Sequence, residues 1–131
     1  MTFLFQKLRV YQQAMALADR VSSLVVGFSR PNWYLADQLR RASLSIALNI
    51  AESTGRVTAA DQRRFLVIAR GSVHECAALF DMCERKKLLP DPERSELTQQ
   101  LVTVSKMLAG MIERVSDPTS VREEAVEYDP Q

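Results

Sequence analysis

Four stretches of the chain repeat apolar residues at alternating spacings of three and four. This spacing is typical of helices that bury one broad face. Glycine and proline signals separate the stretches, so each predicts a separate helix. The predicted helices cover Gln6 to Phe28, about Trp33 to Ser53, about Ala59 to Leu88, and about Pro92 to Val115.

The residues between the stretches suggest how each helix begins and ends. Pro31 interrupts the first pattern, and Asn32 can cap the helix that follows. Gly55 suits the left-handed conformation that commonly follows a helix. Thr58 stands three residues before an acidic side chain, close to the capping-box signature. The predicted connections are therefore only a few residues long.

Four helices of roughly 20 to 30 residues joined by short loops predict antiparallel neighbours. The fold class we expect is all-α, an up-down-up-down four-helix bundle formed by residues 1–116. The near-3.5-residue repeat favours crossing angles of about 20°. Residues 117–131 contain five acidic residues and one basic residue with little periodicity, so we expect an acidic, mobile C-terminal tail.

The second helix carries two apolar arcs. At roughly 100° per residue, one arc collects five residues that we expect in the core, while a second arc lies well away from it. Two apolar arcs imply two packing partners. The first arc is Leu35, Leu39, Ala42, Ile46 and Ile50, and the second is Leu44, Leu48 and Ala51.

A polar ridge separates these arcs at spacings of four, four, three and four: Arg41, Ser45, Asn49, Glu52 and Arg56. One interpretation is a solvated ridge beside ordinary exposed leucines. The other is a subunit interface, whose buried polar groups would need hydrogen-bonding partners because an unpaired buried charge costs several kcal/mol at least.

Composition fits one globular domain. The chain has 131 residues, of which 47% are hydrophobic, and this length can bury an adequate core without a metal or disulfide. We see no apolar run of about 18 residues and no signal-peptide pattern, and therefore expect a soluble, cytoplasmic protein without a membrane partner.

Catalytic chemistry is hard to find. The single histidine, His74, has no metal-ligand partner at a usual spacing, and we expect it in a solvated or interface position. Cys76 and Cys83 are seven residues apart on one helix, too far for a disulfide, and we expect them in the core. No glycine-rich phosphate loop occurs. The sequence therefore predicts neither enzyme activity nor a metal or cofactor.

Charge is distributed unevenly. The net charge is only +1, but residues 30–70 contain seven basic and three acidic residues, and arginine supplies 13 of the 17 basic residues. Arginine suits two-point contacts with phosphate or carboxylate. This pattern fits nucleic-acid binding, pairing with carboxylates across subunits, and a solvated helix face equally well.

Two motifs carry a family resemblance. The first runs from Gln38 to Arg56 and includes Asn49-Ile50-Ala51-Glu52. The second runs from Phe65 to Glu75 and includes Ile68-Ala69-Arg70-Gly71-Ser72. Over about residues 5–115 the chain resembles the bacterial four-helix-bundle proteins encoded in intervening sequences of large-subunit ribosomal RNA genes. A relative of this family is the accessory protein of diversity-generating retroelements.

The resemblance implies a ring-like homopentamer without known catalytic activity. In the retroelement branch it implies binding to nucleic acid and to a reverse transcriptase, whereas the intervening-sequence branch has no known role. The chain differs from the family pattern at Ser53, where glycine is usual, and at Ala47 and Leu48, where proline is common.

Two functions follow as hypotheses. The first is an oligomeric, non-enzymatic module that binds structured RNA or DNA; the second is a protein-only adaptor or structural oligomer with intersubunit salt bridges. The candidate nucleic-acid-binding residues are Arg40, Arg41, Arg56, Arg63, Arg64 and Arg70. The candidate oligomer-interface residues are Leu44, Leu48, Ala51, Glu52, Gly71 and Glu75.

Overall fold

The structure is a computed structural model that describes residues 2–116. Within this range it contains four α-helices and two short 3-10 turns, and no strand. The elements in chain order are η1 (Leu4–Lys7), α1 (Arg9–Val25), η2 (Arg30–Asn32), α2 (Trp33–Thr54), α3 (Ala59–Arg85) and α4 (Asp91–Ser116). The predicted acidic tail, residues 117–131, lies outside the described residues.

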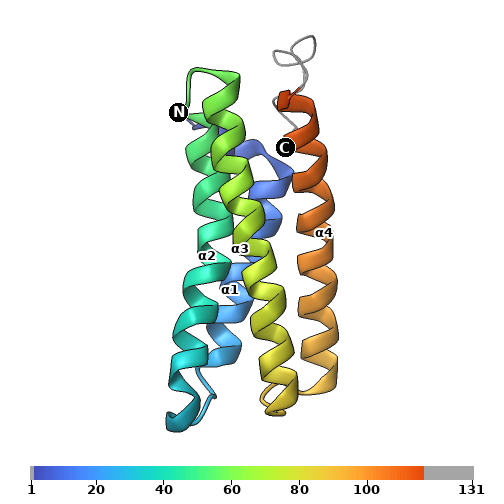
Figure 1. Ribbon diagram of the computed structural model, residues 1–131. Coiled ribbons are helices and arrows are strands. Elements are labelled where there is room, and N and C mark those ends of the chain that lie inside the picture. The colour runs from blue at the N-terminus through green and yellow to red at the C-terminus, as the bar shows by residue number, and fades with distance from the viewer. Residues whose placement is uncertain (1, 117–131) are drawn as a thin grey trace.

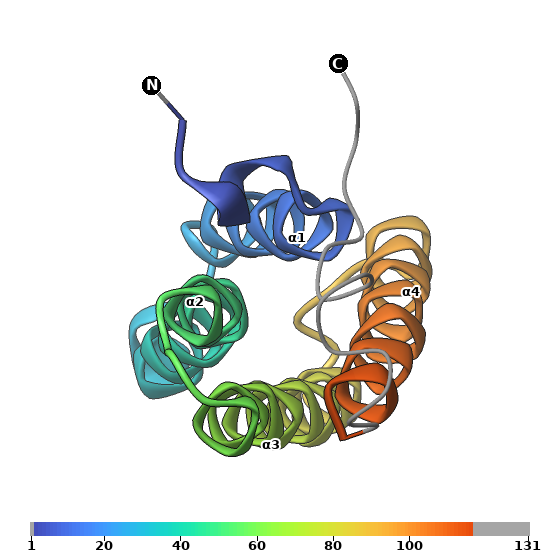
Figure 2. The ribbon, with the colours of Figure 1, turned by 90° about the horizontal axis from the view of Figure 1, so that it is seen from above.

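The helices alternate in direction along the bundle (Figure 1). Each helix packs against the next in sequence, and α4 closes the bundle by packing against α1. Viewed along its axis, the bundle shows the four helices at the corners of a square (Figure 2). The predicted all-α, up-down-up-down four-helix bundle is therefore confirmed. No helix among residues 2–116 is long and apolar enough to cross a membrane.

The heptad-like positions form one hydrophobic core. All five residues of the predicted first arc of α2, from Leu35 to Ile50, are buried, and Cys76 and Cys83 are fully buried as expected. Each of the four helices contributes to the same cluster of buried side chains. The apolar repeat predicted these core positions correctly because burial requires an apolar residue wherever a helical turn faces the bundle axis.

The first helix is shorter than predicted. It begins at Arg9 rather than Gln6, because residues 4–7 form a 3-10 turn and Leu8 is extended, with φ −76° and ψ 128°. It ends at Val25 rather than Phe28. The apolar pattern continues through these flanking turns because they too cover the core, which is why the sequence alone did not show the change of backbone.

The third helix ends at Arg85 rather than Leu88. Lys87 adopts a left-handed conformation with φ 56°, and two backbone hydrogen bonds close the end. The Leu88 N–H donates to the carbonyl of Cys83 at 2.9 Å, and the Lys87 N–H donates to that of Glu84 at 3.0 Å. This is a Schellman motif, which is hard to recognise in sequence when lysine occupies the position usually held by glycine.

The other predicted helix ends agree with the structure only in part. The Thr58 cap is confirmed, since its Oγ1 accepts a hydrogen bond from the Asp61 N–H at 3.1 Å. Asn32 is the N-cap residue of α2, but its side chain makes no capping bond to that helix; its amide donates to Ser29 Oγ at 3.1 Å instead. Gly55 has φ −88° and is not left-handed, so α2 ends in an ordinary right-handed turn.

Candidate assembly and nucleic-acid surface

The middle of the polar ridge joins α2 to α3. Ser45 Oγ lies 2.9 Å from Ser72 Oγ on α3, within hydrogen-bonding distance. The Asn49 amide donates to the Ser45 carbonyl at 2.9 Å and to Ser45 Oγ at 3.0 Å. The ridge is hydrogen-bonded, as a partly buried polar row must be, but these two residues find partners within the chain.

At the α2–α3 turn, two arginines share one aromatic ring. The Arg56 guanidinium carbon lies 4.3 Å from the ring centre of Phe65, and that of Arg64 lies 4.4 Å from it. Each such cation–π contact contributes roughly 0.5–1 kcal/mol at an exposed site. Phe65 has the phase of the α3 core pattern, which continues through Ala69 and Cys76. It is nevertheless only half-buried, under these cations, whereas Leu66 is fully buried.

Carboxylates neutralise the same pair of arginines. Arg56 lies 2.6 Å from a carboxylate oxygen of Glu52 and 3.8 Å from one of Asp61. Arg64 lies 2.9 Å from the other oxygen of Asp61. Asp61 thus links the end of α2 to the first turn of α3. Sequence spacing placed Glu52 and Arg56 four residues apart on one ridge, but the contact of Arg56 with Asp61 and Phe65 depends on how the turn folds.

The six candidate arginines are therefore not equivalent. Three have ion pairs within the chain, since Arg41 also lies 3.2 Å from Asp37. Arg40 and Arg70 make no ion pair with the described residues, and Arg70 is exposed while Arg40 is half-buried. Arg63 is exposed. All six lie on α2, on α3 or in the turn between them.

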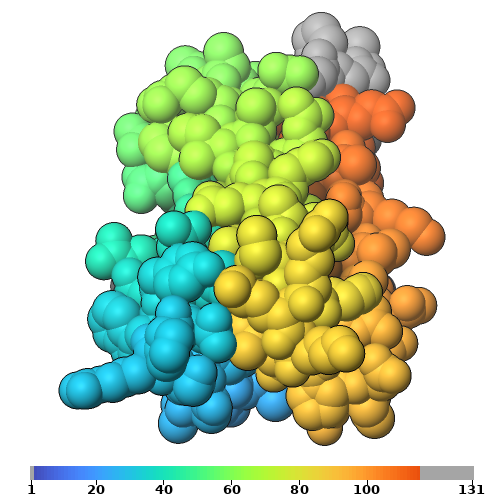
Figure 3. Space-filling view, turned by 60° about the horizontal axis from the view of Figure 1, so that its bottom comes forward, coloured from blue at the N-terminus to red at the C-terminus, as the bar shows by residue number. Residues whose placement is uncertain are grey.

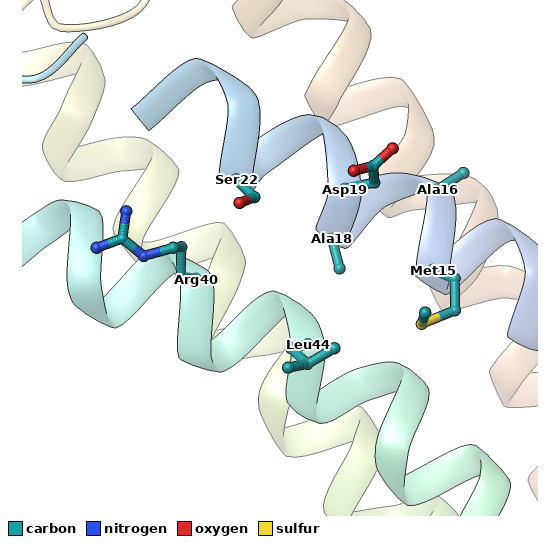
Figure 4. A pocket seen from close by; sticks show the side chains of 7 residues that line it. All are labelled: Met15, Ala16, Ala18, Asp19, Ser22, Arg40 and Leu44. Atoms are coloured by element: carbon teal, nitrogen blue, oxygen red, sulfur yellow. The ribbon is translucent and has the colours of Figure 1, made fainter. Parts of the chain in front are cut away.

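Arg40 borders a groove between α1 and α2 of about 500 Å³. Figure 4 shows Met15 and Ala18 of α1 and Leu44 of α2 facing the same gap, with Arg40 one turn from Leu44. The full lining is Met15, Ala16, Ala18, Asp19, Ser22, Arg40 and Leu44. The α1 residues of this groove were not among the candidates from the sequence. Met15 and Asp19 could have been recognised as surface positions, because they lie on the side of α1 opposite its core pattern.

The candidate interface residues lie mostly at the surface. Leu44 is 41% exposed and Leu48 54% exposed, so the second apolar arc of α2 lies outside the core of this chain. Gly71 on α3 is exposed, and a Cβ added there would have no atom within 4 Å. Of the remaining three candidates, Glu52 and Glu75 are exposed and Ala51 is half-buried.

His74 and the two cysteines lie in different environments. His74 is exposed, and its Nδ1 lies 2.9 Å from the Arg70 carbonyl oxygen. Burial raises the pKa of the Cys76 thiol to about 12, with a contribution from the charge of Glu75, and raises the pKa of the Cys83 thiol to about 11. Such thiols are poor nucleophiles because the thiolate is the reactive form. Residues 2–116 contain no group of three or more potential metal ligands.

Comparison with known proteins adds to this geometry. The structure is similar to the crystal structure of a protein with unknown function from the S23 ribosomal protein family of Bacteroides thetaiotaomicron VPI-5482, with a TM-score of 0.73 and 20% sequence identity. The match covers 79% of this chain and 98% of that chain, and it shows a shared fold. No curated protein matches the chain. Residues 6–110, most of the chain, match the model of the 23S rRNA-intervening sequence proteins, and the chain belongs to that family.

Proposed function

We propose that this protein is a non-enzymatic, oligomeric binding module that engages structured RNA or DNA through the arginines of α2 and α3. The observation that carries the proposal concerns Arg40 of α2 and Arg70 of α3. These two side chains, on neighbouring helices, make no ion pair with the described residues. Arginine contacts phosphate at two points, which suits it to a nucleic-acid backbone. Membership in a family of rRNA intervening-sequence proteins fits this function.

The paired arginines can contribute as well. In the Arg41–Asp37 and Arg64–Asp61 pairs the arginine side chains are exposed and the carboxylates are 33% and 34% exposed. Surface pairs of this kind contribute only about 0–1 kcal/mol. Exchanging such a carboxylate for a phosphate therefore costs little. We expect Arg40 and Arg70 to dominate binding and Arg41 and Arg64 to add smaller contributions.

Assembly belongs to the same proposal. Leu44 and Leu48 expose apolar surface on α2, and the open space at Gly71 would allow another backbone to approach α3 closely. A ring, a homopentamer as the family resemblance implies, would repeat a weak arginine site several times. Repetition increases avidity without new contacts.

The second candidate function is a protein-only adaptor or structural oligomer. Glu75 supports it, because this exposed carboxylate makes no ion pair with the described residues and lies on the same helix as Gly71. In such an oligomer the free arginines would pair with Glu75 of a neighbouring copy. A reverse transcriptase is the kind of protein partner that the family resemblance suggests.

Titration of labelled structured RNA and duplex DNA at low salt, with the full chain and with residues 117–131 deleted, separates the two functions. An assembly making about six phosphate contacts should lose roughly a thousandfold in affinity between 50 and 200 mM salt. Removing the acidic tail, with its five acidic residues, should strengthen binding. The Arg40→Gln and Arg70→Gln variants should weaken it, and Arg9→Gln, at the start of α1, is the matched control.

The outcome decides between the candidates. Absence of binding by either protein at tens of micromolar would favour the protein-only oligomer. Light scattering coupled to gel filtration tests assembly separately, and a mass near that of the 14.8 kDa monomer at micromolar concentration would refute it.

A further inference from the structure

One end of the bundle exposes two adjacent aromatic residues. Trp33 and Tyr34 begin α2, and they are 58% and 48% exposed. Adjacent residues on a helix point about 100° apart, so the two rings leave α2 in different directions. Tryptophan is mostly buried in folded proteins, and neighbouring exposed aromatic residues commonly mark a binding site. Neither ring belongs to the core cluster of the bundle.

Exposed cations lie at the same end. The α1–α2 and α3–α4 connections both lie at this end of the bundle. Figure 3 brings this end forward and shows the first connection in cyan and the second in gold. Arg30 in the first connection is three residues from Trp33. The end of α3 and the second connection together contribute three consecutive basic residues, Arg85, Lys86 and Lys87. These four side chains are exposed and make no ion pair with the described residues.

The nearby carboxylates are largely engaged. Glu84 and Asp91 both lie against Arg94, at 3.4 Å and 3.3 Å, so their charge is shared with that cation. Asp37 pairs with Arg41. Asp81, one turn before Arg85, is an exposed carboxylate without such a partner among the described residues. Glu93, in the first turn of α4, also makes no ion pair with a described residue. The four unpaired cations thus outnumber the two unpaired carboxylates at this end of the bundle.

We propose that this aromatic end, defined as Arg30, Trp33, Tyr34 and Arg85 to Lys87, binds single-stranded nucleic acid. Unpaired bases stack on Trp33 and Tyr34, and the cations hold the phosphates. This combination of aromatic platforms with a positive surface is the general way in which proteins bind single strands. Duplexes are poorer ligands here because their bases are already stacked.

The inference rests on the proposed function and deepens it by naming unpaired bases as the ligand. It also gives that function a second contact area. Arg40 lies seven residues from Trp33, roughly 10 Å along α2, whereas Arg56 lies just beyond the far end of this 22-residue helix, roughly 33 Å away. Variants of Trp33 and Tyr34 therefore test the aromatic end apart from the arginines at the α2–α3 turn.

Fluorescence gives a direct test because Trp33 is the only tryptophan of the chain. The probes are a single-stranded RNA of about 16 nucleotides without internal pairing, near the upper site size for one single-strand module, and the same strand annealed to its complement. The single strand should quench the emission of Trp33 in the full chain. The duplex should leave the emission nearly unchanged.

Variants locate the binding energy, measured by anisotropy of the labelled strand. Trp33→Ala and Tyr34→Ala should each weaken binding roughly fivefold to a hundredfold, the range for losing one stacked base, whereas Trp33→Phe should retain most of the affinity. Val57→Ala is the matched control, since Val57 is 95% exposed at the opposite end. Lys86→Gln should lower the salt slope by about 0.7. Circular dichroism and mass should be unchanged in every variant.

Three results would overturn the inference. If the Trp33→Ala/Tyr34→Ala double variant binds the strand as tightly as the original chain, the aromatic end is not the site, although nucleic-acid binding itself stands. If neither the original chain nor any variant binds RNA or DNA, the proposed function fails as well. If Trp33 emission changes on dilution without RNA and the double variant loses mass, a second copy of the chain covers this end instead.

Discussion

Substitution of Gly71 tests whether the exposed face of α3 contacts another copy, because the expected change in stability differs between a single chain and an assembly. Glycine in a helix interior destabilises it by about 0.8–1.0 kcal/mol relative to alanine. Gly71 lies inside α3 without a positive φ, and an added Cβ would have no atom within 4 Å. Gly71→Ala should therefore stabilise an isolated chain by about that amount.

Urea unfolding followed by circular dichroism measures this effect. With a slope of about 2 kcal/mol per molar urea, the midpoint should rise by about 0.4–0.5 M at protein concentrations where the chain is monomeric. Gly110→Ala is the matched control in α4, where the new Cβ would meet only the end of the Arg114 side chain at 3.4 Å. It should give a similar increase that does not depend on protein concentration.

The larger Gly71→Leu variant examines assembly. If a neighbouring copy approaches α3 closely at Gly71, the leucine side chain should block it, giving a lower mass by light scattering while helicity remains. An unchanged mass would place the interface elsewhere. A lower urea midpoint for Gly71→Ala at the lowest protein concentration would contradict the reasoning itself, because the site would then not be open within one chain.

Three further predictions concern the interior and the α2–α3 turn. Ala69→Leu should destabilise the bundle by about 1–3 kcal/mol in the same urea assay, because Ala69 is fully buried; an unchanged midpoint would indicate unfilled space in the core. Phe65→Leu should cost about 1–2 kcal/mol through loss of two cation–π contacts, and the loss should shrink when Arg56 and Arg64 are already glutamine. Cys76 and Cys83 should resist iodoacetamide in the folded chain at pH 8 and react in urea, because burial raises both thiol pKa values, to about 12 and about 11. The unfolded chain loses these protons first, so stability should fall as pH rises above the ordinary thiol pKa, and alanine at both positions should remove that decline.

The fold was predictable because its signal is periodic. The first arc of α2, from Leu35 to Ile50, is buried on every turn, and the exposure of Leu44 and Leu48 agrees with a second arc outside the core. Phe65 shows where periodicity fails. It has the correct phase for burial, but it lies in the first turns of α3, where Arg56 folds back over its ring.

The candidate site was less predictable because arginine function depends on contacts between elements. Helical spacing indicates the Arg56 pair with Glu52, four residues earlier, but not the contact of Arg56 with Asp61 across a turn. It does not show that Arg70 lacks an ion pair with any described residue. Composition counts all of these arginines equally, whereas the structure separates them by partner.

An arginine that already has an ion-pair partner contributes less to nucleic-acid binding than one that has none. An arginine already paired at the surface gives up less than about 1 kcal/mol when it moves to a phosphate, and it leaves behind a carboxylate that repels the same ligand. Asp61 would remain beside the ligand if Arg64 changed partners, because its backbone N–H is held by the Thr58 cap and its carboxylate also lies 3.8 Å from Arg56. Arg40 and Arg70 leave no such residual charge. If nucleic acid binds this face, removing Asp61 with Asp61→Asn should therefore increase affinity more than removing Arg64 decreases it, while Arg70→Gln should produce the largest loss.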